Sequence, residues 1–305
     1  MRIRNWLVGI TTFLLFGALL WAWVIVSYET DYTTSNTFVG SDVEHEVSNS
    51  STDSLVSASI ESGTETLGWD QLSVSLIVGE TQYPCSLTGI STLQQTGSKV
   101  STRLTADGST FAIEVDATSE DPFVGLDFST MKEVSLANHS MKFSKTDIFL
   151  GNDSVAMIVT NQSFSELQSI PNGSFNLDDS ERLDWYDYDF SVHRINPKDQ
   201  VYVIQESNIT YKLQFISYYN DADESRHIQV LVAWLNGSQL PAFDDPTLIA
   251  ESPCIIEGAD DSWSPSQSIT IRENGIDICN QACSVQISIQ YQGVNVKTIP
   301  KVEVI

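Results

Sequence analysis

Beyond residue 68, hydrophobic positions alternate with their neighbours in short runs along the chain. In the first run, Leu72, Val74, Leu76 and Val78 recur at every second position. A period of two places these side chains on one face of the backbone, which is typical of a half-buried β-strand. The same pattern predicts further strands at residues 111–116, 154–159, 201–204, 210–216, 227–234, 268–271 and 284–289.

Turn-forming residues separate these runs, and no segment after the first 28 residues carries a sustained 3.6-residue apolar stripe. Asn, Asp and Gly favour tight turns because they tolerate a positive φ or bond to nearby backbone amides. Such residues occur at 106–108, 151–153, 220–221, 236–237, 273–275 and 292–293. The sequence therefore predicts an all-β ectodomain made of one or two immunoglobulin-like or other β-sandwich domains.

A faint internal repeat indicates where two such domains would begin. The pattern Leu67-x-Trp69-x-x-Leu72 is similar in character to Leu183-x-Trp185-x-x-Tyr188, 116 residues later. We therefore predict a β-sandwich domain at residues 69–182 and an immunoglobulin-like β domain at residues 183–305. Domains of this size can bury roughly two-thirds of the surface that their unfolded chains expose.

An apolar run without charged residues, Leu7–Val26, follows the basic start of the chain. Twenty helical residues cover the roughly 30 Å hydrocarbon core of a bilayer. Trp6 near one end and Trp21, Trp23 and Tyr28 near the other suit the two membrane interfaces. We predict a transmembrane anchor at residues 1–28; a cleaved signal peptide and a buried soluble helix remain alternatives.

The charges that flank this run predict its orientation. Arg2 and Arg4 precede it, whereas Glu29 and Asp31 follow it. Lys and Arg are retained on the cytoplasmic side of a membrane. The expected localisation is thus the cell membrane, with a single pass, a cytoplasmic amino terminus, an extracellular C-terminal domain and the N-terminal helix as the membrane contact.

The next segment, 29–68, differs in composition from the strand-rich region. From Glu29 to Leu67 it holds 16 Ser or Thr and eight acidic residues, with no Lys, Arg or Pro. A segment with few large apolar groups does not bury enough surface to offset the entropy of ordering. We predict an acidic, Ser/Thr-rich stalk that separates the folded part from the membrane.

The whole chain is strongly acidic, with 40 Asp and Glu against 15 Lys and Arg and a formal net charge of −25. This charge repels phosphate backbones, so nucleic acid is not an expected partner. The acidity fits cation binding, adaptation to a salty medium or simple solubility at a surface.

Seven Asn residues stand in Asn-x-Ser/Thr sequons, a number that fits a glycosylated exterior. The glycosylation candidates are Asn49, Asn138, Asn152, Asn161, Asn172, Asn208 and Asn236.

The four cysteines indicate two disulfides, because even cysteine numbers outside the cytosol usually pair. Our preferred pairing is Cys279 with Cys283, across a predicted turn, and Cys85 with Cys254. The alternatives are a bond from Cys254 to Cys279 or Cys283 and, less favoured, a zinc site.

No motif identifies a catalytic, metal or cofactor site. Acidic clusters at 178–189 and 220–224 could supply calcium ligands, but neither has the spacing of an EF-hand loop. Calcium is therefore possible, no other cofactor is expected, and solvated turns are the simpler interpretation. His45, His139, His193 and His227 stand isolated. We predict that the protein is not an enzyme.

Aromatic residues offer the remaining chemistry. Trp185, Tyr186, Tyr188 and Phe190 follow one another closely, and Tyr218 and Tyr219 form a second group. Because alternate strand positions face opposite sides, part of each group should pack in the core. Exposed rings would stack on sugars or anchor protein partners.

The sequence thus predicts a membrane-anchored extracellular surface protein with a structural or adhesion-type interaction role and a possible protein or glycan partner. The alternatives are a carbohydrate- or solute-binding module, a pilin-like surface subunit and an acidic-pair hydrolase. An amino-terminal span followed by Trp69-Asp70-x-Leu72-x-Val74 resembles archaeal surface and pilin-like proteins. The resemblance covers the anchor and about ten residues after Gly68, and no basic-Gly processing site precedes the apolar run.

Overall fold

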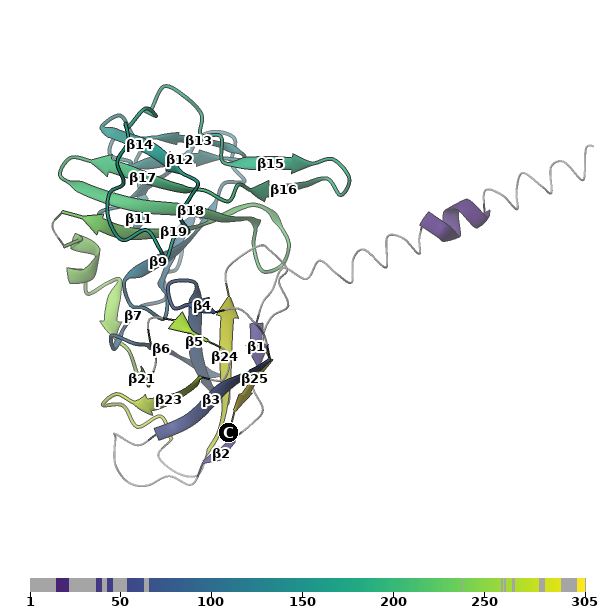
Figure 1. The fold of residues 1–305 in the computed structure, drawn as a ribbon, viewed down its shortest axis with the longest axis vertical. Coiled ribbons are helices and arrows are strands. Elements are labelled where there is room, and N and C mark those ends of the chain that lie inside the picture. The colour runs from purple at the N-terminus through teal and green to yellow at the C-terminus, as the bar shows by residue number, and fades with distance from the viewer. Residues whose placement is uncertain are drawn as a thin grey trace, which may run out of the picture. The chain divides into compact units, whose positions relative to one another are not determined.

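The computed structural model divides the chain into two units, residues 1–35 and 36–305. Figure 1 shows the fold of the described residues. Within these units the structure describes residues 15–21, 37–39, 43–45, 54–62, 66–237, 239–258, 260, 262–264, 267–279, 283–291 and 301–304. The described part of the second unit consists of β-strands and loops with one short 3-10 helix, η1 (Pro241–Asp244). The all-β prediction is confirmed.

The predicted membrane anchor is contradicted. In the first unit the structure describes residues 15–21 as helical. No helix among the described residues is long and apolar enough to cross a membrane. This finding contradicts two predictions, membrane contact through an N-terminal helix and a single-pass localisation. Residues 7–14 and 22–26 of the predicted span lie outside the described residues.

Two antiparallel sheets form a sandwich in the middle of the chain. The six-stranded sheet has the order β14 (Ser154–Val159), β17 (Val201–Glu206), β18 (Ile209–Tyr219), β19 (Ser225–Asn236), β9 (Thr110–Asp116), β8 (Val100–Leu104). The four-stranded sheet has the order β11 (Lys132–Val134), β10 (Val124–Asp127), β12 (Met141–Ser144), β13 (Asp147–Leu150). Alternate residues of both sheets, such as Phe111, Phe143 and Leu213, are fully buried in one shared core.

The nine-stranded sheet encloses a second core. Its order is β1 (Thr37–Val39), β24 (Cys283–Tyr291), β5 (Leu72–Val78), β6 (Thr81–Ser86), β21 (Cys254–Glu257), β23 (Ser268–Glu273), β3 (Ser54–Ser62), β25 (Lys301–Val304), and β2 (Val43–His45) also pairs with β24. Leu72, Leu76, Ile271 and Ile287 fill this core. Two buried indoles, Trp69 and Trp263, stack there with ring centroids 5.7 Å apart.

Three short strand pairs complete the fold. They are β15 (Tyr186–Asp189) with β16 (Arg194–Pro197), β7 (Ile90–Thr92) with β20 (Ile249–Glu251), and β4 (Leu67–Gly68) with β22 (Ser262–Trp263). The segment 160–177 covers the outer face of the six-stranded sheet, where Phe164 and Leu167 are buried against Val203 and Leu231.

Strands on opposite sides of the predicted domain limits pair with each other. The expected stalk, 29–68, supplies β1, β2, β3 and β4, and Leu55, Val56 and Ala58 of β3 are buried. Strands from both sides of residue 182 also pair, as β14 does with β17 and β9 with β19. The sheets therefore join the two predicted domains instead of separating them, and the immunoglobulin-like form is not confirmed.

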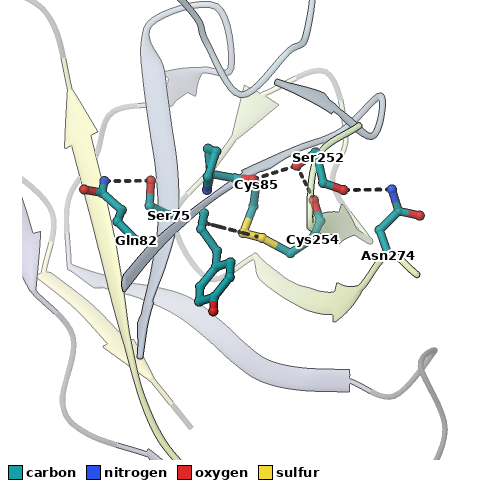
Figure 2. Close-up of a disulfide and its surroundings, with 8 residues drawn as sticks. Ser75, Gln82, Cys85, Ser252, Cys254 and Asn274 are labelled. Atoms are coloured by element: carbon teal, nitrogen blue, oxygen red, sulfur yellow. Dashed lines mark hydrogen bonds between the residues drawn. A yellow bond between two sulfur atoms is a disulfide. The ribbon is translucent and has the colours of Figure 1, made fainter. Parts of the chain in front are cut away.

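A disulfide joins two segments that are far apart in sequence. Cys85 and Cys254 are bonded with a sequence separation of 169 and a Cα–Cα distance of 4.7 Å. They stand opposite each other in the parallel pair β6–β21. Figure 2 shows Ser252 beside this bond; its hydroxyl lies 2.6 Å from the Pro84 carbonyl oxygen, and Asn274 donates to the Ser252 carbonyl. The predicted Cys85–Cys254 pairing is confirmed.

We expect the double substitution Cys85→Ala/Cys254→Ala to lower the free energy of unfolding by about 4 kcal/mol, because a cross-link of this span restricts the unfolded chain. Urea denaturation measures the effect. The slope m should rise as well, since the uncross-linked unfolded state exposes more surface.

Ser252→Ala is the matched control, because it removes local hydrogen bonds but retains the cross-link. It should cost about 1 kcal/mol without a change in m. Equal effects of the two variants on stability and m would contradict the role of the cross-link.

Candidate functional site

The hairpin β15–β16 carries exposed aromatic side chains at its turn. Asp189 pairs with Arg194 as the last cross-strand pair, which leaves a four-residue turn, Phe190 to His193. Figure 1 shows the hairpin extending beyond the strands of the sandwich. The element thus presents the side chains of its turn to solvent.

Local hydrogen bonds and a positive φ form this turn. The carboxylate oxygen Oδ1 of Asp189 accepts bonds from the Ser191 amide at 2.8 Å and from its hydroxyl at 2.6 Å. These bonds lower the pKa of Asp189. His193 closes the turn with φ +56°, in the left-handed region. An Asp-x-Ser sequence therefore specifies the chain reversal.

The exposed rings form a small contact surface, which we call the aromatic tip: Tyr188, Phe190 and His193. The Phe190 side chain is 80% exposed and that of Tyr188 is 40% exposed. Their ring centroids are 4.8 Å apart and their planes meet at 80°. The Tyr188 hydroxyl lies 3.0 Å from His193 Nδ1. One face of Phe190 therefore remains available to a ligand beside polar ring edges.

The base of the hairpin is fixed by the sandwich core. Trp185 is completely buried, and its ring packs against Tyr186, Phe215 and Tyr218 with centroid distances of 5.0, 4.9 and 6.2 Å. Its indole N–H donates to the Thr146 carbonyl oxygen at 3.0 Å. The rule of alternating faces thus separates buried Trp185 from exposed Tyr188 and Phe190.

Arg194 holds the other strand of the hairpin. Its guanidinium donates two hydrogen bonds to the Asp223 carboxylate, at 2.9 and 2.6 Å, and lies 3.9 Å from the centroid of the Tyr219 ring. The Tyr219 hydroxyl accepts a hydrogen bond from the Ile195 amide. A bidentate ion pair combined with ring stacking limits the motion of the strand. The aromatic tip therefore stands on a rigid base.

A polar hollow lies on the outer face of the six-stranded sheet. It is lined by Ser101, Arg103, Ala112, Ile113, Glu114, Asp221 and Gln229. Burial lowers the pKa of Arg103, and nearby Asp221 and Glu114 oppose this effect. The hollow measures about 70 Å³. That space suits about two water molecules, whereas sites for drug-sized ligands span about 300–1,000 Å³.

A buried lysine connects the covering segment 160–177 to the sheet. Lys212 donates to the carbonyl oxygens of Phe164 and Leu167, at 2.7 and 3.1 Å. Burial lowers its pKa. The Ser165 hydroxyl donates its single proton between the two carboxylate oxygens of Asp70, at 3.0 and 2.8 Å, and burial raises the pKa of this carboxyl. These bonds occupy the polar groups in structural contacts, so we do not treat them as a reactive site.

The acidic clusters that suggested calcium are engaged locally. Asp178 accepts bonds from Ser180, Asp184 pairs with Lys198 at 2.6 Å, and Asp223 pairs with Arg194. Among the described residues, no group of three or more His, Cys, Asp and Glu side chains could hold a metal ion. Calcium binding stays untested.

The histidines lie apart from one another. His139 is buried and its Nδ1 lies 2.9 Å from the Leu136 carbonyl oxygen; burial lowers its pKa. His193 belongs to the aromatic tip, and His227 lies 3.3 Å from a carboxylate oxygen of Glu114. The side chain of His45 lies outside the described residues.

Two sets of candidate residues remain predictions. Cys279 is buried, and the side chain of Cys283 lies outside the described residues, so their pairing is not tested. The sequon asparagines that the structure describes are all exposed: Asn138, Asn152, Asn161, Asn172, Asn208 and Asn236. Asn49 lies outside the described residues.

Comparison with known proteins gives no family. No family model matches the chain, and no curated protein matches it. A candidate lipoprotein from Bacteroides fragilis is 16% identical over 43% of this chain and 92% of its own, with a TM-score of 0.36. A candidate HmuY-like heme-binding protein from Bacteroides vulgatus is 13% identical over 43% of this chain and 94% of its own, also with a TM-score of 0.36.

The apo form of an HmuY analogue from Tannerella forsythia is 12% identical over 65% of this chain and 98% of its own, with a TM-score of 0.28. Scores this low establish no common fold, and they carry no argument about the function of this chain.

We expect Arg194→Lys to loosen the hairpin, because lysine provides neither the bidentate geometry nor the planar stacking of arginine. The free energy of unfolding should fall by about 1 kcal/mol, since the Asp223 partner is half exposed. Amide hydrogen exchange at residues 186–197 should accelerate. Arg272→Lys, which alters the ion pair with Glu257 in the nine-stranded sheet, is the control. Unchanged amide hydrogen exchange in Arg194→Lys would contradict the role of Arg194 in holding the hairpin.

The raised pKa of Asp70 predicts a pH effect. Its folded-state pKa exceeds the ordinary value of 3.8, so folding favours the protonated form. The stability of the natural chain relative to Asp70→Asn should therefore fall as pH rises from below 3.8 through the folded-state pKa. Urea unfolding between about pH 2 and pH 7 measures this difference.

Asp178 provides a control of opposite sign, because hydrogen bonds from Ser180 lower its pKa. Relative to Asp178→Asn, the natural chain should gain stability as pH rises through the folded-state pKa toward 3.8. The same pH trend for both substitutions would contradict the assigned burial of Asp70.

Proposed function

We propose that this chain is a surface ligand-binding protein and that the aromatic tip is its contact site. The observation that carries the proposal is the 80% exposure of Phe190 on a turn whose base is held by Trp185 and Arg194. Folding gains nothing from an exposed phenyl ring, whereas association can bury it. A rigid base also reduces the entropy that binding would otherwise cost.

The disulfide supports a location outside the reducing cytosol. Cys85–Cys254 lies in the nine-stranded sheet, and structural disulfides persist in exported proteins. The second pair of cysteines and the sequons fit the same compartment.

The chemistry of the tip favours a neutral carbohydrate as ligand. The net charge of −25 repels anionic ligands. An aromatic face stacks on the apolar face of a sugar ring, and the Tyr188 hydroxyl and His193 imidazole next to it can bond sugar hydroxyls. The 80° angle between the two rings offers one ring face instead of a flat platform, which suits contact with a single sugar unit.

A titration of the full chain with neutral oligosaccharides, chosen from a glycan array, tests this proposal. We expect Phe190→Ala to weaken binding about tenfold, which corresponds to about 1.4 kcal/mol for one stacked ring. Trp234→Ala is the matched control, since Trp234 is also exposed but lies on β19, outside the tip. Absence of any neutral glycan ligand, or equal loss in both variants, would contradict the proposal.

A further inference from the structure

Four sequon asparagines lie at turns or strand ends of the sandwich. Asn138 is in the β11–β12 turn, Asn152 in the β13–β14 turn and Asn208 in the β17–β18 turn, while Asn236 ends β19. All four are exposed. A bulky glycan needs such a position, because it does not fit within a packed sheet.

Strand register places these four asparagines at one end of the sandwich. Asn236 is opposite Thr210, the first residue after the β18 start at Ile209, and a Cβ added to Gly237 would lie 2.5 Å from the Asn208 carbonyl oxygen. Asn208 and Asn236 are therefore neighbours. Ser154 pairs with Glu206 at the same strand ends, which brings Asn152 close to them.

The fourth asparagine joins this end through the facing sheet. The Ser140 hydroxyl donates to Glu206 at 2.7 Å, and the Gly151 amide donates to the Ser140 carbonyl oxygen at 2.8 Å. Asn138, two residues before Ser140, thus lies beside the ends of β13 and β17. We call this surface, with Asn138, Asn152, Asn208 and Asn236, the sequon end.

The aromatic tip is attached at the opposite end of the same sheet. Strand β18 runs from Ile209 at the sequon end to Tyr219, and Tyr219 contacts Ile195 and Arg194 of the hairpin. Eleven strand residues extend about 35 Å at roughly 3.3 Å each. In Figure 1 the hairpin extends away from the β17–β18 turn.

We propose that Asn138, Asn152, Asn208 and Asn236 carry N-linked glycans, so that the sequon end is covered with sugar. These four glycans limit protein contact at one end of the sandwich, the end that does not carry the aromatic tip. The part that concerns the tip rests on the proposed function, whereas the modification itself does not.

Burial of the sequon hydroxyls indicates when the modification occurs. The second recognition residue of a sequon is its Ser or Thr, and Ser140, Ser154 and Thr210 are all buried in the folded chain. Asn138, Asn152 and Asn208 must therefore be modified before the sandwich closes. Glycosylation that precedes folding is consistent with transfer to a chain still being exported.

Peptide mass spectrometry of the full chain, purified from its native source, tests the proposal. We expect a glycan mass on at least three of the four asparagines. Asn196, exposed on β16 but outside any sequon, is the internal control and should be bare. Glycans on two or fewer of the four would overturn the proposal.

A second experiment separates this proposal from the proposed function. The variant Asn138→Gln/Asn152→Gln/Asn208→Gln/Asn236→Gln, produced in the same source, should lose the glycans and keep glycan-ligand binding within twofold. Substitution of asparagine is preferable to that of Ser140, since the Ser140 hydroxyl bonds Glu206 and the Phe128 amide. A tenfold loss of binding in a variant that retains its unfolding midpoint would contradict the separation of the sequon end from the aromatic tip.

If no oligosaccharide binds the natural chain, the proposed function fails, while the occupancy measurement still decides whether the sequon end is modified.

Unmodified refolded chain tests whether glycosylation precedes folding. Incubated with the transferase fraction of the source, it should accept sugar at Asn161 more readily than at Asn208, because Ser163 is exposed and Thr210 is buried. Equal transfer would overturn modification before folding.

Discussion

The fold depends on the parallel pairing of β6 with β21, which the Cys85–Cys254 bond fixes. A parallel pair needs a long crossover between its strands. Here the crossover consists of the whole sandwich, because its strands from β8 to β19 all lie between the two cysteines. The nine-stranded sheet is therefore built from both ends of the second unit, and the sandwich is inserted into it. The cross-link restrains the two points where the chain leaves this sheet and returns.

This nested order explains which parts of the fold could be predicted from the sequence. Alternation is a local property, so the strands at 72–78, 154–159 and 201–204 were predicted close to their observed limits. Strand partners are not local. The pairing of β9 with β19 joins residues more than 100 positions apart, and neither strand carries a sign of the other. The repeated pattern around Trp69 and Trp185 consequently suggested two tandem domains. In the structure, the sheets instead connect the two predicted domains.

The expected stalk illustrates a second limit. Its Ser and Thr content suggested disorder, yet β3 alternates Ser57 and Ser59 with buried Val56 and Ala58 and pairs with β23 and β25. The alternation from Val56 to Ser59 was a usable signal. Serine is compatible with an antiparallel strand that packs only one of its faces, so composition alone did not reveal the strand.

Several acidic residues have a structural role in turns. In the part of the chain that the structure describes, six Asp-x-Ser/Thr sequences form the same turn, in which the carboxylate accepts a hydrogen bond from the amide two positions on: Asp107, Asp116, Asp127, Asp178, Asp189 and Asp245. At Asp245, hydrogen bonds from Lys132 and Thr247 lower the pKa to about 2. A chain with many short strands needs many turns, and part of the acidity follows from this need.

The candidate site combines a predictable and an unpredictable component. Alternation correctly required that some aromatic rings enter the core, and Trp185 and Tyr218 do so. It gave no sign that Arg194 would bond Asp223 and thereby hold the exposed rings on a fixed base, because Arg194 lies on β16 and Asp223 lies in the β18–β19 turn. The resulting tip places an exposed phenyl ring on a molecule with a net charge of −25. The ligand proposed for the tip therefore lacks net negative charge, because the charge of the chain repels anions.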